Sequence, residues 1–371
     1  MGGPERCRLR DLDTAVGVLP TGPLNAITDV PGVRVGHCTV SWGGPELPVG
    51  SGPARTGVTA VLPHGDDIWS ERVVAGAFVA NGVGEVIGIS AIREWGLMET
   101  PILLTNSQSA GAVYDAAVRW MMDRDPRIGV EDAVIPIVGE CDDGLLNDLR
   151  GMHVKEEHVR EALDGAAGGP VAEGCVGAGT GMTCFDFKSG IGTSSRVVTA
   201  HGLPFTVGVL ALTNFGVRHR FMVDGVPVGR EITDLLPVES REGSCIVVLA
   251  TDAPLCARQC ERLAKRCSLG LAATGSYASD GSGEIMLAFT SAHRVPRASA
   301  GMLQLASVAN EQMCGLFEAA VDATAESVVN SICAAHTTVG RDAQLAHALP
   351  LDRLAAALRK YGREARSPDG A

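Results

Sequence analysis

The chain has 371 residues, of which 46% are apolar, and its 31 Lys and Arg against 43 Asp and Glu give a formal net charge of −12. This negative charge argues against nucleic acid or an anionic membrane surface as the main partner. The 11 cysteines are scattered, without a C-x-x-C pair, which indicates reduced thiols in a cytoplasmic protein. We expect no signal peptide, and no apolar run reaches the ~20 residues of a membrane span.

Apolar runs bounded by turn residues predict mixed strands and helices. We expect strands at 57–63, 101–106, 133–140, 204–214, 245–251 and 283–290, and two short strands each within 24–38 and 174–196. Helices are expected at 109–124, 154–165, 253–271 and 351–361, with a long helical region at 303–335 and a strand, loop and short helix at 77–90. Continuous apolar strands suit sheets covered on both faces, so the chain is predicted to form a layered α/β fold.

One junction carries most of the chemical information. A charged loop at 234–243 leads into the buried strand that follows Ser244. If the Gly243–Ser244 bond were cut, Ser244 would carry a free amine beside its hydroxyl. An α-amine has a pKa of about 7.7–8.0, so it can accept the hydroxyl proton near neutral pH and activate the serine as a nucleophile. The alternative is an ordinary loop-to-strand junction with a capping serine.

A second polar pair lies at the start of the 283–290 strand. Ser282 and Glu284 are two residues apart, so in a strand both side chains point to one face. An unpaired carboxylate beside an apolar strand would be costly, so we expect Glu284 to have a partner. The alternative is a turn followed by a strand-edge charge.

Other features do not indicate a cofactor or a metal. The glycine-rich segment 177–181 lacks the G-x-G-x-x-G spacing and the lysine of phosphate-binding loops, and tight turns explain it better. Cys256 and Cys260 lie one helical turn apart, but no third and fourth ligand follow at a familiar spacing. We therefore expect no cofactor and no metal.

Several blocks between about residues 24 and 295 together resemble the L-aminopeptidase/D-amidase/D-esterase (DmpA-like) family, which includes the β-aminopeptidases. The junction at Gly243–Ser244 and the apolar strand after it are one such block. The others are ITDVPGVRVGH at 27–37, LTNS at 104–107, VGAGTGM at 176–182, GIGTSSR at 190–196, LTNFG at 212–216 and SDGSGE at 279–284. Agreement at this many places in the same order is far beyond chance.

The resemblance implies a self-processing hydrolase with an α/β fold, a four-layer αββα sandwich of the kind shared with ornithine acetyltransferase. The chain is expected to cleave itself between Gly243 and Ser244. Residues 1–243 and residues 244–371, the latter starting with the nucleophile, would stay together as one structural domain. The expected reaction releases N-terminal amino acids from peptides, amides or esters through an acyl-enzyme on Ser244.

The resemblance also implies a role for each site residue. Asn214, at the end of its strand, would donate a hydrogen bond to the developing oxyanion. Ser282 and Glu284 would surround the hydroxyl and the amine of Ser244. Glu140 would hold the ammonium group of the substrate, the alternative being a strand-end charge.

The sequence departs from the family pattern at two places. Cys141-Asp142-Asp143-Gly144 stands where members often carry an aromatic residue, and Asp186 stands where a glycine is expected. An acidic pair in place of a ring is expected to alter the pocket wall. The preference among L-α-, D-α- and β-amino substrates therefore stays open.

Three alternatives remain beside the hydrolase. An acyltransferase of the ornithine acetyltransferase type and a hydrolase of nylon-type oligomers are both expected to use threonine as nucleophile, so Ser244 speaks against them. The third is an unprocessed binding protein with the same fold, against which the intact set of site residues argues. We expect a homo-oligomer of processed pairs that acts on small peptides or amides in the cytoplasm.

Overall fold

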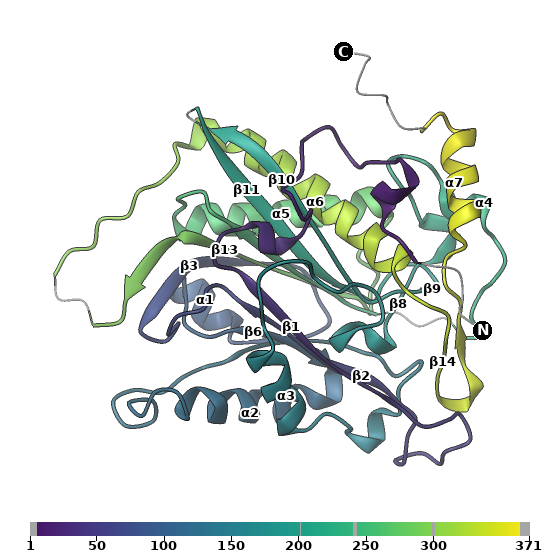
Figure 1. Cartoon of the computed structure of the whole chain (residues 1–371), viewed down its shortest axis with the longest axis horizontal. Coiled ribbons are helices and arrows are strands. Elements are labelled where there is room, and N and C mark those ends of the chain that lie inside the picture. The colour runs from purple at the N-terminus through teal and green to yellow at the C-terminus, as the bar shows by residue number, and fades with distance from the viewer. Residues whose placement is uncertain (1–5, 201, 240–242, 299–300, 364–371) are drawn as a thin grey trace.

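The structure, a computed structural model, describes residues 6–200, 202–239, 243–298 and 301–363. In this part of the chain two main sheets pack face to face between two layers of helices (Figure 1). The first sheet has the strand order β1 (Arg34–Trp42), β2 (Ala54–Leu62), β6 (Ile102–Asn106), β7 (Ile137–Cys141) and β4 (Val86–Ile87). The second has the order β10 (Ile191–Ala200), β11 (Leu203–Thr213), β12 (Cys245–Thr251), β13 (Gly283–Pro296), β3 (Glu71–Gly82) and β5 (Leu97–Met98).

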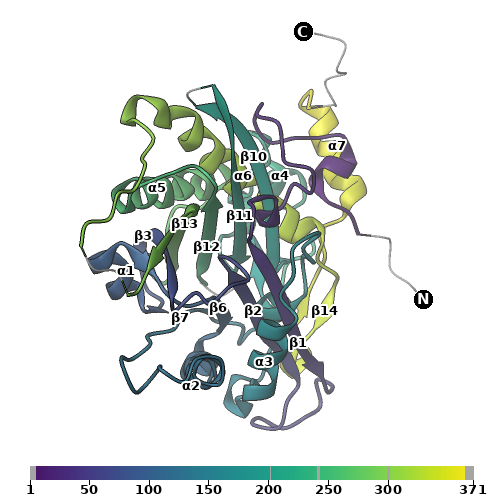
Figure 2. The same ribbon diagram turned by 60° about the vertical axis from the view of Figure 1, so that its left-hand side comes forward.

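Helices cover the outer face of each sheet, as the two views show (Figures 1 and 2). Helices α2 (Ala110–Met122) and α3 (Glu156–Asp164) share a core with the first sheet. Helices α5 (Ala257–Thr274) and α6 (Met313–Cys333) share a larger core with the second sheet. The order of layers is therefore helix, sheet, sheet, helix, which confirms the expected four-layer αββα sandwich.

Shorter elements connect these layers. They are the helices α1 (Ile89–Trp95), α4 (Val228–Glu231) and α7 (Leu351–Lys360), and the hairpins of β8 (Thr183–Cys184) with β9 (Phe187–Lys188) and of β14 (Thr338–Val339) with β15 (Leu345–Ala346). Short 3₁₀ helices lie at η1 (Leu9–Leu12), η2 (Ile27–Asp29), η3 (Ser107–Ser109), η4 (Leu149–Gly151), η5 (Gly177–Gly181), η6 (Arg218–Arg220), η7 (Asn310–Gln312) and η8 (Arg341–Ala343).

The position of strand β12 between two cores explains why its sequence is continuously apolar. Ile246 and Val248 belong to the core between the two sheets, whereas Val247 and Leu249 belong to the core beneath α5 and α6. Successive side chains of a strand point to opposite faces, so a strand covered on both sides needs apolar residues at every position. The pattern thus places the start of β12, with Ser244 before it, in the middle of the sandwich.

Predictions for three regions of the sequence are wrong. Within 24–38 only the second half is a strand, because the carboxylate of Asp29 accepts hydrogen bonds from the amides of Leu24 at 2.9 Å and Ala26 at 3.0 Å and shapes a turn there instead. The long helix begins at Met313 rather than near residue 303. Residues 307–309 ahead of it lie at the start of α5 without helical structure, where the amide of Val308 donates to the carbonyl of Pro254 at 2.9 Å and Nε2 of Gln259 donates to the carbonyl of Val308 at 2.7 Å.

The glycine-rich region is also more irregular than expected. The predicted pair of strands at 174–196 is replaced by η5, the small β8–β9 hairpin and the start of β10. Part of the charged loop at 234–243, namely residues 240–242, lies outside the described residues.

Candidate active site

The pairing of three strands brings the predicted residues of the second sheet together. Cys245 pairs with Thr213 of β11 on one side and with Glu284 of β13 on the other. Asn214 directly follows β11, and its amide donates to the carbonyl of Ser244 at 3.0 Å. Ser244 therefore lies between Asn214 and the start of β13, at one end of the central strands.

Gly243 fits against Asn214 only because it has no side chain. A Cβ built on Gly243 would lie 1.9 Å from the carbonyl oxygen of Asn214 and 2.6 Å from its Nδ2. Such contacts are impossible for any other residue without moving the backbone. The amide group of Asn214 thus lies directly beside the residue whose carbonyl precedes Ser244.

The side-chain amide of Asn214 is held rigidly. Its Oδ1 accepts from the amide of Thr183 at 3.0 Å, and its Nδ2 donates to the carbonyl of Asp142 at 2.7 Å. Only 6% of the residue is exposed. An amide nitrogen has two hydrogens, so one remains available for a further acceptor.

Ser282 and Glu284 form the pair that their spacing predicts. The hydroxyl of Ser282 donates to Oε1 of Glu284 at 2.6 Å, and both residues are buried. Burial raises the pKa of the Glu284 carboxyl, while the hydrogen bond from Ser282 opposes this rise. Glu284 therefore has the partner that we expected.

Glu140 reaches the same site from the other sheet. It lies in β7, where its Oε1 accepts from the amide of Glu85 at 2.9 Å and its Oε2 accepts from the hydroxyl of Ser107. Gly84 lies close to both residues, because a Cβ built on it would be 3.6 Å from Oε1 of Glu140 and 3.5 Å from Oγ of Ser244. The structure thus brings Glu140 to the site of Ser244.

Sequence reasoning missed several neighbours of these residues. Thr183 and Asp142 act through backbone atoms, which leave no signature in a sequence, and Gly84 was one of many glycines. Ser107 stands inside one of the blocks that carry the family resemblance, which could have pointed to it.

The two departures from the family pattern have structural explanations. Asp143 is fully buried, where it accepts from Nδ2 of Asn147 at 2.9 Å, and burial raises the pKa of its carboxyl to about 7. This side chain therefore lies inside the protein and not on a pocket wall. Asp186 has a φ of 60°, in the left-handed region that glycine adopts most easily, and this explains why a glycine suits that position.

None of the helices in the described ranges has the length and hydropathy needed to span a bilayer.

Comparisons with known proteins identify the class. The model of peptidase family S58 matches residues 25–346. Beta-peptidyl aminopeptidase BapA of Sphingosinicella microcystinivorans is 42% identical, over 96% of this chain and 93% of its own length. The solved PH0078 protein of Pyrococcus horikoshii is 44% identical with a TM-score of 0.92, over 96% of this chain and 100% of its own.

A further solved structure is the L-aminopeptidase D-Ala-esterase/amidase of Ochrobactrum anthropi, described as a prototype of the serine aminopeptidases and a variant of the Ntn-hydrolase fold. It is 42% identical with a TM-score of 0.91, over 96% of this chain and 99% of its own. The fold and the site thus define a hydrolase with the Ntn-type sandwich. The chain belongs to peptidase family S58 and is an aminopeptidase.

Proposed function

We propose that this aminopeptidase cleaves its own Gly243–Ser244 bond and then uses Ser244 as its nucleophile. The close contact between Gly243 and Asn214 is the observation that carries the proposal. It supports a donor beside the carbonyl that Ser244 would attack, at the start of a rigid buried strand. The family membership supports the same reading, since the related structure from Ochrobactrum is described as a serine aminopeptidase.

The self-cleavage proceeds in two steps. Oγ of Ser244 attacks the carbonyl carbon of Gly243, the peptide C–N bond breaks, and the nitrogen leaves as the free α-amine of Ser244 with the proton of the hydroxyl. Water then hydrolyses the ester, which leaves the carboxylate of Gly243 and restores the hydroxyl. The free hydrogen on Nδ2 of Asn214 would stabilise the oxyanion in each step.

The same groups then act on substrate. The ammonium group of the substrate binds at Glu140, whose two oxygens retain lone pairs beyond the bonds to Glu85 and Ser107. Ser244 attacks the adjacent amide or ester carbonyl, its α-amine accepts the hydroxyl proton and passes it to the leaving group, and water releases the acyl-enzyme. The hydrogen-bonded pair of Ser282 and Glu284 orients the hydroxyl and the amine.

We propose substrates with a free N-terminal amine, among them β-aminoacyl peptides and amides. The support is the similarity to two Sphingosinicella proteins named beta-peptidyl aminopeptidase, at 42% and 41% identity. The carboxylate of Glu140 suits a positively charged amine, whatever side chain the substrate carries.

We also propose that processed pairs assemble into a homo-oligomer that works in the cytoplasm. Met302 is 96% exposed, and Leu303 and Leu305 on the same extended segment are exposed as well. Exposed apolar groups of this kind mark contact surfaces when they lie together. Light scattering after size-exclusion chromatography would give the mass, and a mass of one chain would rule out the oligomer.

Intact mass under denaturing conditions tests the central proposal. The wild type should give two fragments that meet between Gly243 and Ser244, and Ser244→Ala should give a single full-length species. Ser268→Ala, which removes a hydroxyl that bonds only to its own helix, should be processed like the wild type. A wild type that remains full length would refute the mechanism.

A further inference from the structure

The loop from Val83 to Glu85, between β3 and β4, is held by both sheets at the site. On the side of the second sheet, a Cβ built on Gly283 would lie 2.3 Å from the carbonyl oxygen of Val83 and 3.1 Å from Cα of Gly84. On the side of the first sheet, the amide of Glu140 donates to the carbonyl of Glu85 at 3.2 Å, and the amide of Glu85 donates to Oε1 of Glu140 at 2.9 Å. Contacts with both sheets therefore hold the backbone of Gly84 in place.

Gly84 lies between the two groups that would hold a substrate. The position of its missing Cβ is 3.5 Å from Oγ of Ser244 and 3.6 Å from Oε1 of Glu140, so the two oxygens lie no farther apart than the sum of these distances. Ser244 and Glu140 are themselves nearly buried, whereas Gly84 is exposed. Gly84 is thus the solvent-facing member of the three.

We propose that Gly84 is a specificity-determining residue, because its missing side chain leaves room for the carbon link that joins the ammonium group of the substrate to its scissile carbonyl. The inference rests on the proposed function, in which Glu140 binds the ammonium and Ser244 attacks the carbonyl. A substrate held at both points must run its intervening carbons through the space between them. A methyl group on residue 84 would occupy that same space.

A methyl group at this position competes with the substrate and leaves the protein undisturbed. All contacts of a Cβ on Gly84 are at 3.5 Å or more, which is ordinary van der Waals range, and its φ is not in the left-handed region. Gly84→Ala should therefore fold and process normally. Substrates whose linking carbons carry a substituent should lose more kcat/KM than unsubstituted substrates with a link of the same length.

Two matched pairs of p-nitroanilides test this, each pair differing by one methyl group. They are glycyl with L-alanyl, and β-alanyl with 3-aminobutyryl. In Gly84→Ala the ratio of kcat/KM for the substituted over the unsubstituted member should fall by about 10-fold to 200-fold relative to wild type, the range for one methyl group in a tight pocket. The ratio is read in each pair that the wild type hydrolyses.

Gly82→Ala is the matched control. A Cβ on Gly82 would meet only Cγ1 of Val79, at 3.6 Å, so its ratios should equal those of wild type. Intact mass and the thermal midpoint are measured for every variant.

Two outcomes would overturn the role of Gly84. Unchanged ratios would show that the substrate carbons do not pass Gly84, and an equal loss for all four probes would show that the methyl group disturbs Ser244 itself. A wild type that hydrolyses none of the probes, or a Ser244→Ala variant that hydrolyses them as fast, would overturn the proposed function as well.

Discussion

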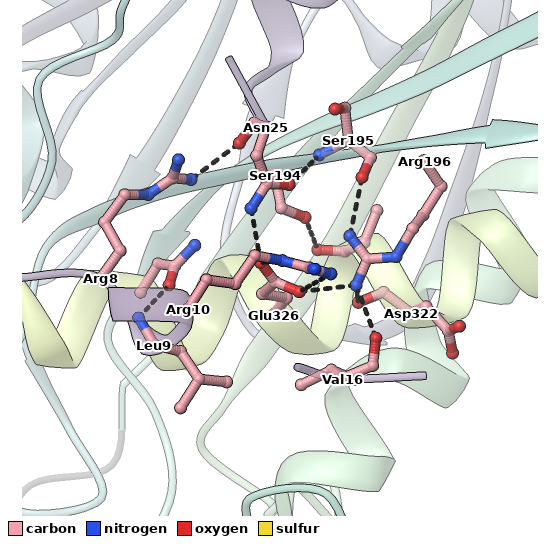
Figure 3. Close-up of polar contacts among 12 residues, drawn as sticks. Arg8, Leu9, Arg10, Val16, Asn25, Ser194, Ser195, Arg196, Asp322 and Glu326 are labelled. Atoms are coloured by element: carbon pink, nitrogen blue, oxygen red, sulfur yellow. Dashed lines mark hydrogen bonds and ion pairs between the residues drawn. The ribbon is translucent and has the colours of Figure 1, made fainter. Parts of the chain in front are cut away.

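The guanidinium of Arg196 on β10 lies 2.7 Å from the carboxylate of Glu326 on α6, and both side chains are fully buried (Figure 3). Arg10 binds the same carboxylate at 2.8 Å, and Nδ2 of Asn25 donates to it at 2.6 Å. The three donors precede the proposed cleavage site in the chain, whereas Glu326 follows it. This cluster therefore joins the two parts of the chain independently of the peptide bond between them.

Glu326→Gln should destabilise the protein by about 3–5 kcal/mol, because it leaves the buried guanidinium of Arg196 without its counter-charge. Urea unfolding of processed protein should show the two fragments separating at lower denaturant concentration. The exposed Glu156→Gln, which breaks only a surface pair with Arg160, should cost less than about 1 kcal/mol. Equal midpoints for the two variants would contradict the role of the cluster.

The same cluster contributes a pH dependence of known sign. Burial alone would raise the pKa of Glu326, but Arg196, Arg10 and Asn25 together hold it below its ordinary value. The stability that this ionised carboxylate contributes is present above its unfolded pKa of about 4.3 and is lost as the pH falls through the lower folded value.

Asn214→Ala should lower kcat by about 100-fold to 1,000-fold, because the variant loses a positioned donor to the oxyanion. Self-processing should slow as well, since the same donor serves both reactions, and single-turnover assays with mass spectrometry would measure both rates. Asn330→Ala is a suitable comparison, because Asn330 is equally buried and hydrogen-bonded but lies on α6. It should lose stability and retain kcat.

Glu284→Gln should shift the acid limb of the profile of kcat/KM against pH to lower values, by about one unit. An ionised Glu284 favours the protonated α-amine of Ser244, and the amine must be neutral to accept the proton of the hydroxyl. A glutamine can still accept the hydrogen bond from Ser282, so the local geometry is kept. Superimposable profiles would show that the charge of Glu284 does not affect the pKa of the α-amine.

Glu140→Gln should raise KM by about 10-fold to 100-fold, in line with the loss of a charge-assisted hydrogen bond of about 1.5–3 kcal/mol. Processing should be normal, because the precursor presents no substrate ammonium at this stage. Glu85→Gln is the control, since Glu85 contacts Glu140 through its backbone while its own side chain is exposed. A defect in processing equal to that in KM would indicate a structural role for Glu140.

Asp143→Asn should flatten the dependence of stability on pH in the acid to neutral range. The protonated carboxyl favours the folded state fully below its unfolded pKa of about 3.9, and this contribution is lost as the pH rises to about 7. In that window each pH unit costs up to about 1.4 kcal/mol from this group. Chemical unfolding at several pH values should show the difference in slope, and parallel curves would contradict it.

Local patterns in the sequence were enough for the elements that depend on neighbouring residues. The apolar run after Ser244 predicted a strand buried on both faces, and β12 is such a strand because its side chains enter two different cores. The two-residue spacing of Ser282 and Glu284 predicted a shared face, and a hydrogen bond of 2.6 Å joins them. Both predictions rest on the alternation of side chains along a strand.

The extended segment before α6 shows where such patterns fail. Its apolar residues have the composition of a helix, but hydrogen bonds to Pro254 and Gln259, about fifty residues earlier in the chain, hold it extended. Composition cannot reveal a competing partner that is distant in sequence.

By itself the sequence determined the family and the buried strand behind Ser244, because these follow from motifs and from the periodicity of side chains. Only the tertiary structure decided that Glu140 of one sheet faces Ser244 of the other across Gly84, and that backbone atoms of Thr183 and Asp142 orient Asn214. The physical reason is that these contacts join segments from both sheets and use backbone atoms or an absent side chain, neither of which has a local signature in the amino-acid sequence.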